Sequence, residues 1–466
     1  IYFVAACFSQ RYILAIMGCA GVANALIMRA CLSITITQMV RPINHTSESG
    51  EIYHDPDACP ALPVTPANPT KPHNFLQHPG EFDWDEKTQG KILSAFYYGY
   101  IFTHIPGGLL SEKFGGKYTL GVGIFSTAIF TLLTPWAARM GSDELIALGL
   151  CNNTFSVLAP FFQFSGVQIG NVMANSMSSL ILEFIPGGWP WVFYIFGGVG
   201  MIWCSWTGFD IYIVVSLSEE HNCISTLKNL YSQIDLGPMP WKAILTSGPV
   251  WALIIAEVGH DWGLYTMVTD LPKYMNDVMH FSVAQNGILS SLPYLVMWFS
   301  PYRLVHLPTG SSKWSTSVIP GIGVLAASYV GCDKVAVSVL FTAGMGFMGF
   351  CYASLRVNSL DLSPNYSGTI MALVNGIGCI SGMGTPYIVG ILTPNRSLKE
   401  WRVVFWIMFV ILTLTNFVYM FFGTGEVQPW NDLSEQETSS TDDKRTLKEK
   451  ESNTTQDDPE KSIGVK

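Results

Sequence analysis

The sequence predicts an all-α membrane protein with about twelve transmembrane helices in two halves of six. Three observations predict this class. Charged residues make up only 13% of the 466 residues and hydrophobic residues 49%, whereas a soluble domain carries about 25% charged residues. Long apolar runs recur along the chain, and a short basic turn, Glu112–Lys117, separates two of them. Such a turn between two spans is typical of a cytosolic loop.

The apolar runs give the order of the helices. A transmembrane helix needs about 20 apolar residues, and Leu145–Ile185 carries only Glu183 as a charge, so this segment is long enough for two spans. The run Ser317–Cys332 is shorter. The other predicted spans are Tyr12–Val40, Lys91–Leu110, Tyr118–Ala138, Pro190–Leu217, Val250–Leu271, Gly287–His306, Val335–Val357, Thr369–Leu392 and Val403–Phe422.

The loops set the topology. A cytosolic turn at 112–117 places residues 41–90 in a lumenal or extracellular loop, where the sequon at Asn44 predicts glycosylation. The predicted units are an N-terminal half at 1–216, a central cytosolic loop at 217–241, a C-terminal half at 242–423 and a disordered tail at 424–466. Both termini are then cytosolic. The chain begins with Ile1 instead of Met, so we expect the true N-terminus to lie upstream.

Arg29 is the most informative single residue. An arginine in the middle of a span costs about 2.5 kcal/mol or more to insert, so it must face a polar cavity or a partner. One interpretation is an anion-binding cation near the midplane of the membrane. The alternative is a salt bridge that holds two spans together.

Glu257, His260 and Asp261 form a second group in the predicted seventh span. Spacings of three and four place them on one helical face, which has to line the protein interior or a water-filled path. A histidine beside carboxylates suits proton exchange near neutral pH. We therefore predict cation coupling here, against the alternative of a polar patch at the lumenal end without a coupling role.

Smaller motifs complete the candidate residues. His104 is a candidate cavity residue, or a packed histidine bonded to a backbone carbonyl. The turn with Gly108, Glu112, Lys113, Gly115 and Lys117 is predicted to lock helix ends in one transport state, and Asn358 and Asp361 mark the cytosolic end of the tenth span. Gly166, Gly170 and Ala174 predict a close-packing seam. The glycines between Asn375 and Pro386 predict a broken or kinked eleventh helix.

The cysteines and the charge exclude several classes of function. Cys59 and Cys332 both fall in predicted non-cytosolic loops, where a disulfide or two free thiols are possible. The net charge of −9 comes mainly from the first loop and the tail, so nothing indicates a nucleic-acid partner. No metal-ligand spacing, cofactor motif or nucleophile–base set appears, so we expect neither an enzyme nor a bound cofactor.

The chain resembles the family of sialin, the vesicular glutamate transporters and the sodium–phosphate cotransporters, anion:cation symporters of the major facilitator superfamily. The matching blocks are Arg29, Phe82–Lys117, Trp189–Gly200 and Asn358–Trp401 with Gly425–Trp430; Gly259–Trp262 and Asp270–Tyr274 resemble the insect branch named for inorganic phosphate cotransport. The resemblance implies that Arg29 is the family's first-span arginine. His260 stands where glutamate-transporting members have an arginine, which disfavours a vesicular glutamate carrier.

Two segments depart from the family pattern. The fourth span of the family carries an Arg and a Glu, whereas residues 145–163 carry neither, and residues 300–316 lack the usual charged hairpin between spans eight and nine. We expect a monomeric symporter of a small inorganic or organic anion, coupled to sodium or protons, in the plasma membrane or a lysosomal or vesicular membrane. Arg29, His104 and His260 would bind the anion. The alternatives are a transport-inactive scaffold or anion sensor, or an incomplete gene model.

Overall fold

The described part of the protein is helical throughout. The computed structural model describes residues 10–41, 59, 80–114, 116–152, 163–185, 187–217, 239–299 and 317–431. Within these residues the one β pairing is an isolated bridge between Val40 and Phe82. The predicted all-α class is therefore confirmed.

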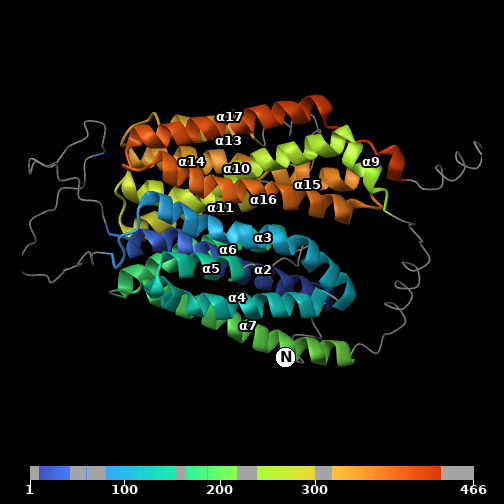
Figure 1. Cartoon of the computed structure of the whole chain (residues 1–466), viewed down its shortest axis with the longest axis horizontal. Coiled ribbons are helices and arrows are strands. Elements are labelled where there is room, and N and C mark those ends of the chain that lie inside the picture. The colour runs from blue at the N-terminus through green and yellow to red at the C-terminus, as the bar shows by residue number, and fades with distance from the viewer. Residues whose placement is uncertain are drawn as a thin grey trace, which may run out of the picture.

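The first half of the chain forms one bundle, coloured blue to green in Figure 1. Its described helices are α2 (Gln10–Met39), α3 (Glu86–Phe114), α4 (Gly116–Met140), α5 (Ser142–Asn152), α6 (Gln163–Phe184) and α7 (Trp189–Leu217). Each falls on a predicted span. The seam prediction for α6 is confirmed, because a Cβ added to Gly166 or Gly170 would lie 2.8 Å from a backbone carbonyl oxygen of α2.

The second half forms the other bundle, coloured yellow to red. Its described elements are α9 (Trp241–Thr246), α10 (Gly248–Asp277), α11 (Val283–Phe299), α13 (Val318–Ala327), α14 (Lys334–Met348), α15 (Cys351–Leu362), α16 (Ser367–Leu392), α17 (Leu398–Phe422) and the 3₁₀ turn η2 (Pro429–Asn431). The tenth predicted span is divided between α14 and α15. The eleventh is a single uninterrupted helix with Pro386 inside it, so α16 is not broken, and the kinked alternative stays a prediction.

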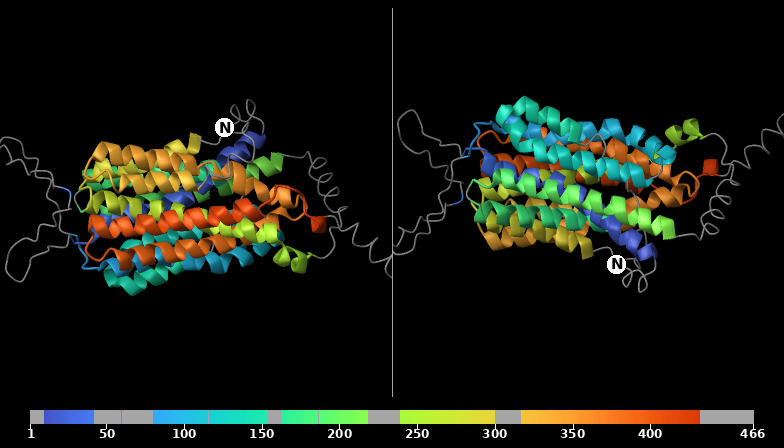
Figure 2. Two further views of the ribbon diagram at one scale, coloured as in Figure 1. Left: turned by 90° about the horizontal axis from the view of Figure 1, so that it is seen from above. Right: turned by 90° about the horizontal axis from the view of Figure 1, so that it is seen from below.

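The two bundles lie side by side with their helices running in a common direction (Figures 1 and 2). Helices from the two halves meet in three pairs: α3 with α16, α6 with α11, and α2 with α10. The candidate residues Arg29 and Glu257 therefore lie on helices at the boundary between the halves.

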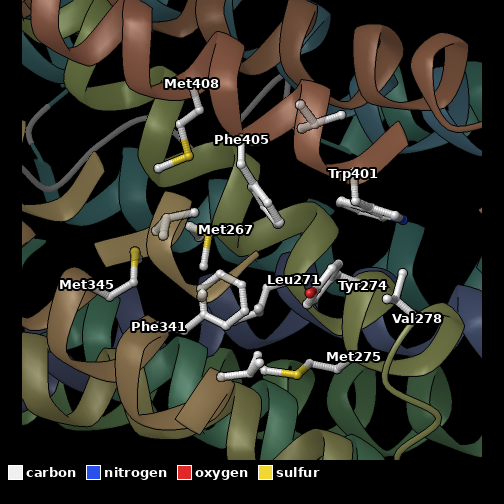
Figure 3. Packing of buried hydrophobic residues seen from close by; sticks show 14 of the residues in the cluster. Met267, Leu271, Tyr274, Met275, Val278, Phe341, Met345, Trp401, Phe405 and Met408 are labelled. Atoms are coloured by element: carbon white, nitrogen blue, oxygen red, sulfur yellow. The ribbon is translucent and has the colours of Figure 1, made fainter. Parts of the chain in front are cut away.

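Each half has its own apolar core. Tyr274 of α10 is the centre of an aromatic cluster, with ring centroids 5.5 Å from Phe341, 5.3 Å from Trp401 and 5.3 Å from Phe405 (Figure 3). Edge-on aromatic pairs of this kind add about 0.5–1.5 kcal/mol each beyond the burial of their surface. This cluster holds α10 firmly against α14 and α17 and so fixes the helix that carries Glu257 and Asp261.

Not every helix is long enough to cross a membrane. Four described helical segments are both long enough and apolar enough to cross a membrane: Ile16–Met39, Gly121–Met140, Ser367–Leu392 and Leu398–Phe422. At about 1.5 Å per residue, α13 is only ~15 Å long, about half the thickness of the hydrocarbon core. The description of α5 stops at Asn152, next to residues outside the described part. Both adjoin the atypical segments 145–163 and 300–316, of which residues 153–162 and 300–316 lie outside the described part.

Residues just after α17 fold back onto the protein. Trp430 is only 7% exposed and packs against Tyr366, in the turn between α15 and α16. The Asn431 carboxamide oxygen accepts a hydrogen bond of 2.7 Å from Ser363, and Gln428 N–H donates to Leu362. The predicted start of the disordered tail at residue 424 is therefore wrong, because residues up to Asn431 are ordered by the packing of Trp430 against Tyr366. Residues from 432 onward lie outside the described range.

Candidate functional site

Arg29 of α2 lies in a cage of aromatic rings. Its guanidinium carbon is 4.2 Å from the ring centre of Phe96 and 4.6 Å from that of Tyr97, both on α3, and 5.5 Å from that of Tyr265 on α10. Cation–π contacts in a desolvated site stabilise by about 2 kcal/mol. Among the described carboxylates none forms an ion pair with Arg29, so the salt-bridge alternative is not what these residues form.

A small cavity adjoins the cage. Its volume is about 60 Å³ and its lining includes Arg29, Phe96 and Tyr97. Hydroxyl groups of Ser33, Thr134 and Thr269 belong to lining residues. A cavity needs about 10–15 Å³ of such volume to hold one water molecule. The cavity therefore has room for a few water-sized groups beside the guanidinium of Arg29.

Glu257 and Asp261 of α10 form a second charged centre. Glu257 is 1% exposed and Asp261 is 2% exposed. One guanidinium nitrogen of Arg356, on α15, lies 2.6 Å from Glu257 Oε1 and 3.9 Å from Asp261 Oδ1. The spacing of four residues puts both carboxylates on the same face of α10, and that face meets α15 and α16.

Gly378 of α16 makes room for this pair. A Cβ at Gly378 would lie 2.7 Å from Asp261 Oδ2 and 3.3 Å from Glu257 Cγ. Asn375, one turn earlier on α16, accepts a hydrogen bond from the Arg356 guanidinium through its carboxamide oxygen. The glycine and the asparagine of α16 therefore hold the charged residues of α10 and α15 in one place.

His260 is separate from this ion pair. It is buried, and its Nδ1 has no hydrogen-bond partner among the described residues. The structure brings Glu257 and Asp261 together around Arg356, and within the described residues no hydrogen bond or ion pair joins His260 to them. On the predicted topology Gly248 is the cytosolic start of α10, and Glu257 lies nine residues from it, so this topology disfavours the lumenal-end alternative.

Arg356 is the residue that the sequence analysis missed. It falls inside the predicted span Val335–Val357, and a charged residue within an apolar span is itself a signal of a functional site. The aromatic cage of Arg29 gave no comparable signal, since aromatic residues are frequent in membrane helices.

A network of ion pairs lies at the other end of the interface. Glu86, at the start of α3, is 4% exposed and bonds two cations of the second half. Arg396 Nε is 2.6 Å from Glu86 Oε1, and Lys273 of α10 forms an ion pair with Glu86 Oε2. Arg396 also lies 3.7 Å from Asp277. These contacts join the two halves at the end where α3 begins and α16 ends.

Close helix crossings reinforce this end. A Cβ on Gly90 of α3 would overlap with the carbonyl oxygen of Pro386 on α16, and one on Gly390 would overlap with the backbone of Glu86. At the α6–α11 crossing, Gly287 abuts Ser179, and the Ser176 hydroxyl donates to that of Ser291 at 3.1 Å. By the predicted topology this is the lumenal or extracellular end, so the halves are closed there.

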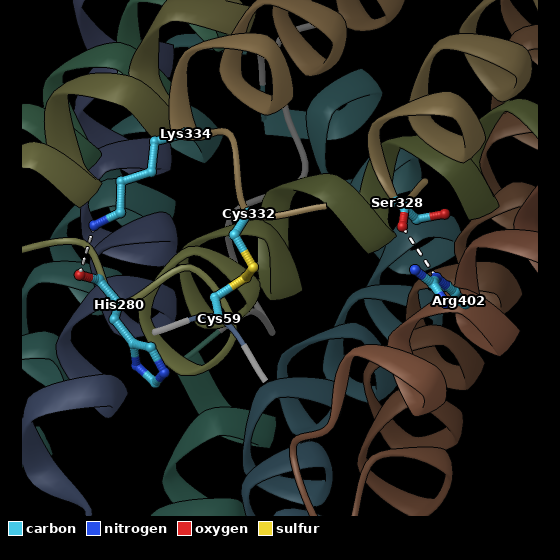
Figure 4. Close-up of a disulfide and its surroundings, with 6 residues drawn as sticks. All are labelled: Cys59, His280, Ser328, Cys332, Lys334 and Arg402. Carbon is cyan, nitrogen blue, oxygen red and sulfur yellow. Dashed lines mark hydrogen bonds between the residues drawn. A yellow bond between two sulfur atoms is a disulfide. The ribbon is translucent and has the colours of Figure 1, made fainter. Parts of the chain in front are cut away.

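The disulfide and the motif residues complete the predicted set. Cys59 and Cys332 are joined by a disulfide with a Cα–Cα distance of 5.3 Å (Figure 4). Asn358 lies inside α15 and donates a 2.6 Å hydrogen bond to the Tyr419 hydroxyl, while Asp361 is half-buried. Several predictions concern residues outside the described part of the structure. These are the whole residues Asn44 and Gly115, the packing of Gly108 and the side chains of His104, Glu112, Lys113 and Lys117.

The fold is found in solved transporters. An inward-facing, unoccupied bacterial homologue of the human lysosomal transporter Spinster superposes with a TM-score of 0.62 at 12% identity, covering 90% of this chain and 99% of its own. The inward-open xylose transporter of E. coli gives a TM-score of 0.61 at 12% identity, covering 88% and 96%. At this identity the likeness concerns the fold.

Sequence comparison reaches further. Residues 161–386 match the Major Facilitator Superfamily. Human sialin is 34% identical, covering 91% of this chain and 91% of sialin. A Drosophila melanogaster protein named for inorganic phosphate cotransport is 33% identical, over 92% of this chain and 88% of its own. Bos taurus vesicular glutamate transporter 2 is 29% identical, over 91% of this chain and 76% of its own.

Fold and comparisons together define a multi-span membrane transporter. The chain belongs to the family of sialin, the vesicular glutamate transporters and the phosphate cotransporters within the major facilitator superfamily. The alignment with the Drosophila protein spans 488 positions, more than the 466 residues of this chain. The relative therefore carries residues within the aligned region that this chain lacks.

Proposed function

We propose that this protein is a symporter that moves a small inorganic or organic anion by alternating access, coupled to sodium or protons. Arg29 binds the anion. The observation that carries this proposal is a guanidinium at the boundary between the halves, next to a cavity and without an ion pair to any described carboxylate. A cation held by aromatic rings keeps its charge available for an anion, which a salt bridge would not.

The closed outer end supports alternating access. Ion pairs and glycine crossings join the halves at that end, and a carrier of two halves exposes its central site to one side at a time by rocking one half against the other. The Glu86 contacts must then break when the site opens outward.

Cation coupling is assigned to the α10 residues. Glu257, Asp261 and His260 are buried in the second half, and the first two share one guanidinium. Two carboxylates against one arginine leave a negative charge that a bound cation would neutralise, and an uncompensated buried charge is costly. His260 and His104 are proposed as further anion-binding residues.

The test is uptake of labelled phosphate, sialic acid and glutamate into proteoliposomes under sodium or proton gradients. We expect Arg29→Ala to abolish accumulation of the transported anion and Arg29→Lys to retain part of it, because a lysine keeps the charge but loses the planar group. Arg139→Ala, a half-exposed arginine at the outer end, is the matched control. Unchanged uptake in Arg29→Ala would overturn the binding role.

The second candidate function is a transport-inactive anion sensor on the same fold. The departures from the family pattern favour it, because residues 145–163 carry neither the Arg nor the Glu of the family's fourth span and residues 300–316 lack the charged hairpin. Specific binding of a labelled anion without accumulation under any gradient would support this function. Accumulation would exclude it.

A further inference from the structure

Three of the four carboxylate oxygens of Glu257 and Asp261 lack a hydrogen-bond donor among the described residues. Both carboxylate oxygens of Glu257 and Oδ1 of Asp261 are buried and have no aligned hydrogen-bond donor. The 2.6 Å contact of Glu257 with Arg356 is an ion-pair distance without the geometry of an aligned hydrogen bond. An ionised carboxylate only accepts hydrogen bonds, whereas a protonated one also donates. One proton on the pair would supply the missing donor.

The described surroundings of the two carboxylates add little compensating charge. Arg356 is the one cation in ion-pair contact with the two carboxylates among the described residues. Arg29 is stacked on aromatic rings. The other charged or titratable groups within electrostatic reach are His260, Cys351, Cys379, Tyr100, Tyr265 and Tyr419. With both carboxylates ionised, the pair and Arg356 together carry one net negative charge in a buried site.

A metal cation fits this site poorly. Hard cations take about six oxygen ligands, whereas the guanidinium of Arg356 lies against the carboxylates. The Asn375 carboxamide oxygen, a neutral oxygen close to Arg356, already accepts from that guanidinium. Gly378 brings the backbone of α16 against Asp261 Oδ2 and leaves little room there. A proton needs no coordination sphere, and two neighbouring carboxylates readily share one.

We infer that Glu257 and Asp261 share one exchangeable proton, with Arg356 as their fixed counter-ion, so that the coupling cation of this chain is a proton and not sodium. The inference rests on the proposed transport function. The O–H bond forms when a hydronium ion on one side of the membrane gives its proton to the pair, and it breaks when water on the other side takes that proton. The cluster thus alternates between zero and one net negative charge.

The first test needs no substrate. Infrared difference spectra of the purified, reconstituted full chain between high and low pH should contain the carbonyl stretch of a protonated carboxyl. We expect this band to disappear in Glu257→Gln and Asp261→Asn and to be unaffected by adding sodium. In Arg356→Gln the band should persist to higher pH, and Arg356→Lys should restore the wild-type behaviour. Glu183→Gln, a partly exposed carboxyl near the end of α6, should leave the band unchanged.

The outcomes separate this inference from the proposed function. A band that the two variants leave intact, or that sodium removes, overturns the shared proton. Uptake of labelled phosphate driven by sodium and indifferent to pH also overturns it, while the transport function stands. If the band behaves as expected but no tested anion accumulates, the proposed transport function fails and the proton site stands.

Discussion

Glu86 of α3 accepts a 2.6 Å hydrogen bond from Arg396 Nε, and this contact joins the first half of the protein to the turn between α16 and α17 in the second half. Lys273 of α10 binds the other carboxylate oxygen. One buried carboxylate thus pairs with two cations of the opposite half, and Asp277, 3.7 Å from Arg396, supplies a second negative charge. Removing one partner of a buried ion pair is strongly destabilising, by about 3–5 kcal/mol, because the remaining charges stay unpaired.

Glu86→Gln is therefore expected to shift the protein toward states open at the outer end. The measurement is labelling of Ser291→Cys, at the α6–α11 contact, by a membrane-impermeant maleimide from outside. The rate should rise at least about tenfold, since 1.4 kcal/mol already gives that factor. Glu144→Gln, an exposed carboxylate in the first turn of α5, is the control. Equal labelling rates in both variants would contradict the role of Glu86.

Gly90→Leu is expected to prevent closure of the outer end. A side chain at Gly90 meets the backbone of Pro386, and overpacking costs about 1–3 kcal/mol. Transport should fall while outside labelling at Ser291→Cys increases. Gly198→Leu on α7 is the matched control, because nothing lies within 4 Å of a Cβ there. Normal uptake in Gly90→Leu would show that the crossing does not close during transport.

The disulfide between Cys59 and Cys332 should hold the two halves together after cleavage. The cysteines are 273 residues apart, so a protease site inserted at 218–238 cuts between them. We expect the fragments to migrate together on a denaturing gel without reductant and apart with it. In Cys59→Ser or Cys332→Ser they should separate in both conditions. Wild-type fragments that separate without reductant would exclude the disulfide.

Trp430→Ala is expected to lower stability by about 3 kcal/mol, the cost typical of removing a buried large aromatic side chain. The measurement is thermal unfolding of the detergent-purified protein. Truncation after residue 423 should reproduce the loss, whereas truncation after 431 should not, because Asn431 completes the described contacts with Ser363 and Asn365. Equal melting temperatures for the two truncations would show that this segment does not contribute to stability.

Acid should weaken the outer end through His280, between α10 and α11. Burial lowers the pKa of His280 below its usual value, with the Asp277 carboxylate opposing this effect and Lys334 adding to it. The stability contributed by the neutral imidazole is thus present above about pH 6.5 and is lost as the pH falls. In His280→Asn, which suits the positive φ of 50°, the loss of melting temperature between pH 7.5 and pH 5.5 should be smaller. An identical loss of melting temperature in the wild type and in His280→Asn would show that His280 does not cause the acid sensitivity.

The sequence predicted the fold and two of the three residues of the charged centre, Glu257 and Asp261 but not Arg356. Spans follow from the length of apolar runs, and Arg29, Glu257 and Asp261 were visible because charges inside spans are costly. Glu86, Lys273 and Arg396 lie at helix ends, where charges are ordinarily solvated, so only the packing of α3 against α10 and α16 reveals their burial. The aromatic cage likewise depends on which helices become neighbours in space.

The C-terminal segment also bears on the order in which the protein is assembled. Trp430 and Asn431 pack against the turn at 363–366, and they are synthesised only after α16 and α17. The turn at 363–366 therefore gains its contacts with Trp430 and Asn431 only after α17 has been synthesised. The contact between Trp430 and Tyr366 is therefore one of the last described contacts that the second half can form during synthesis.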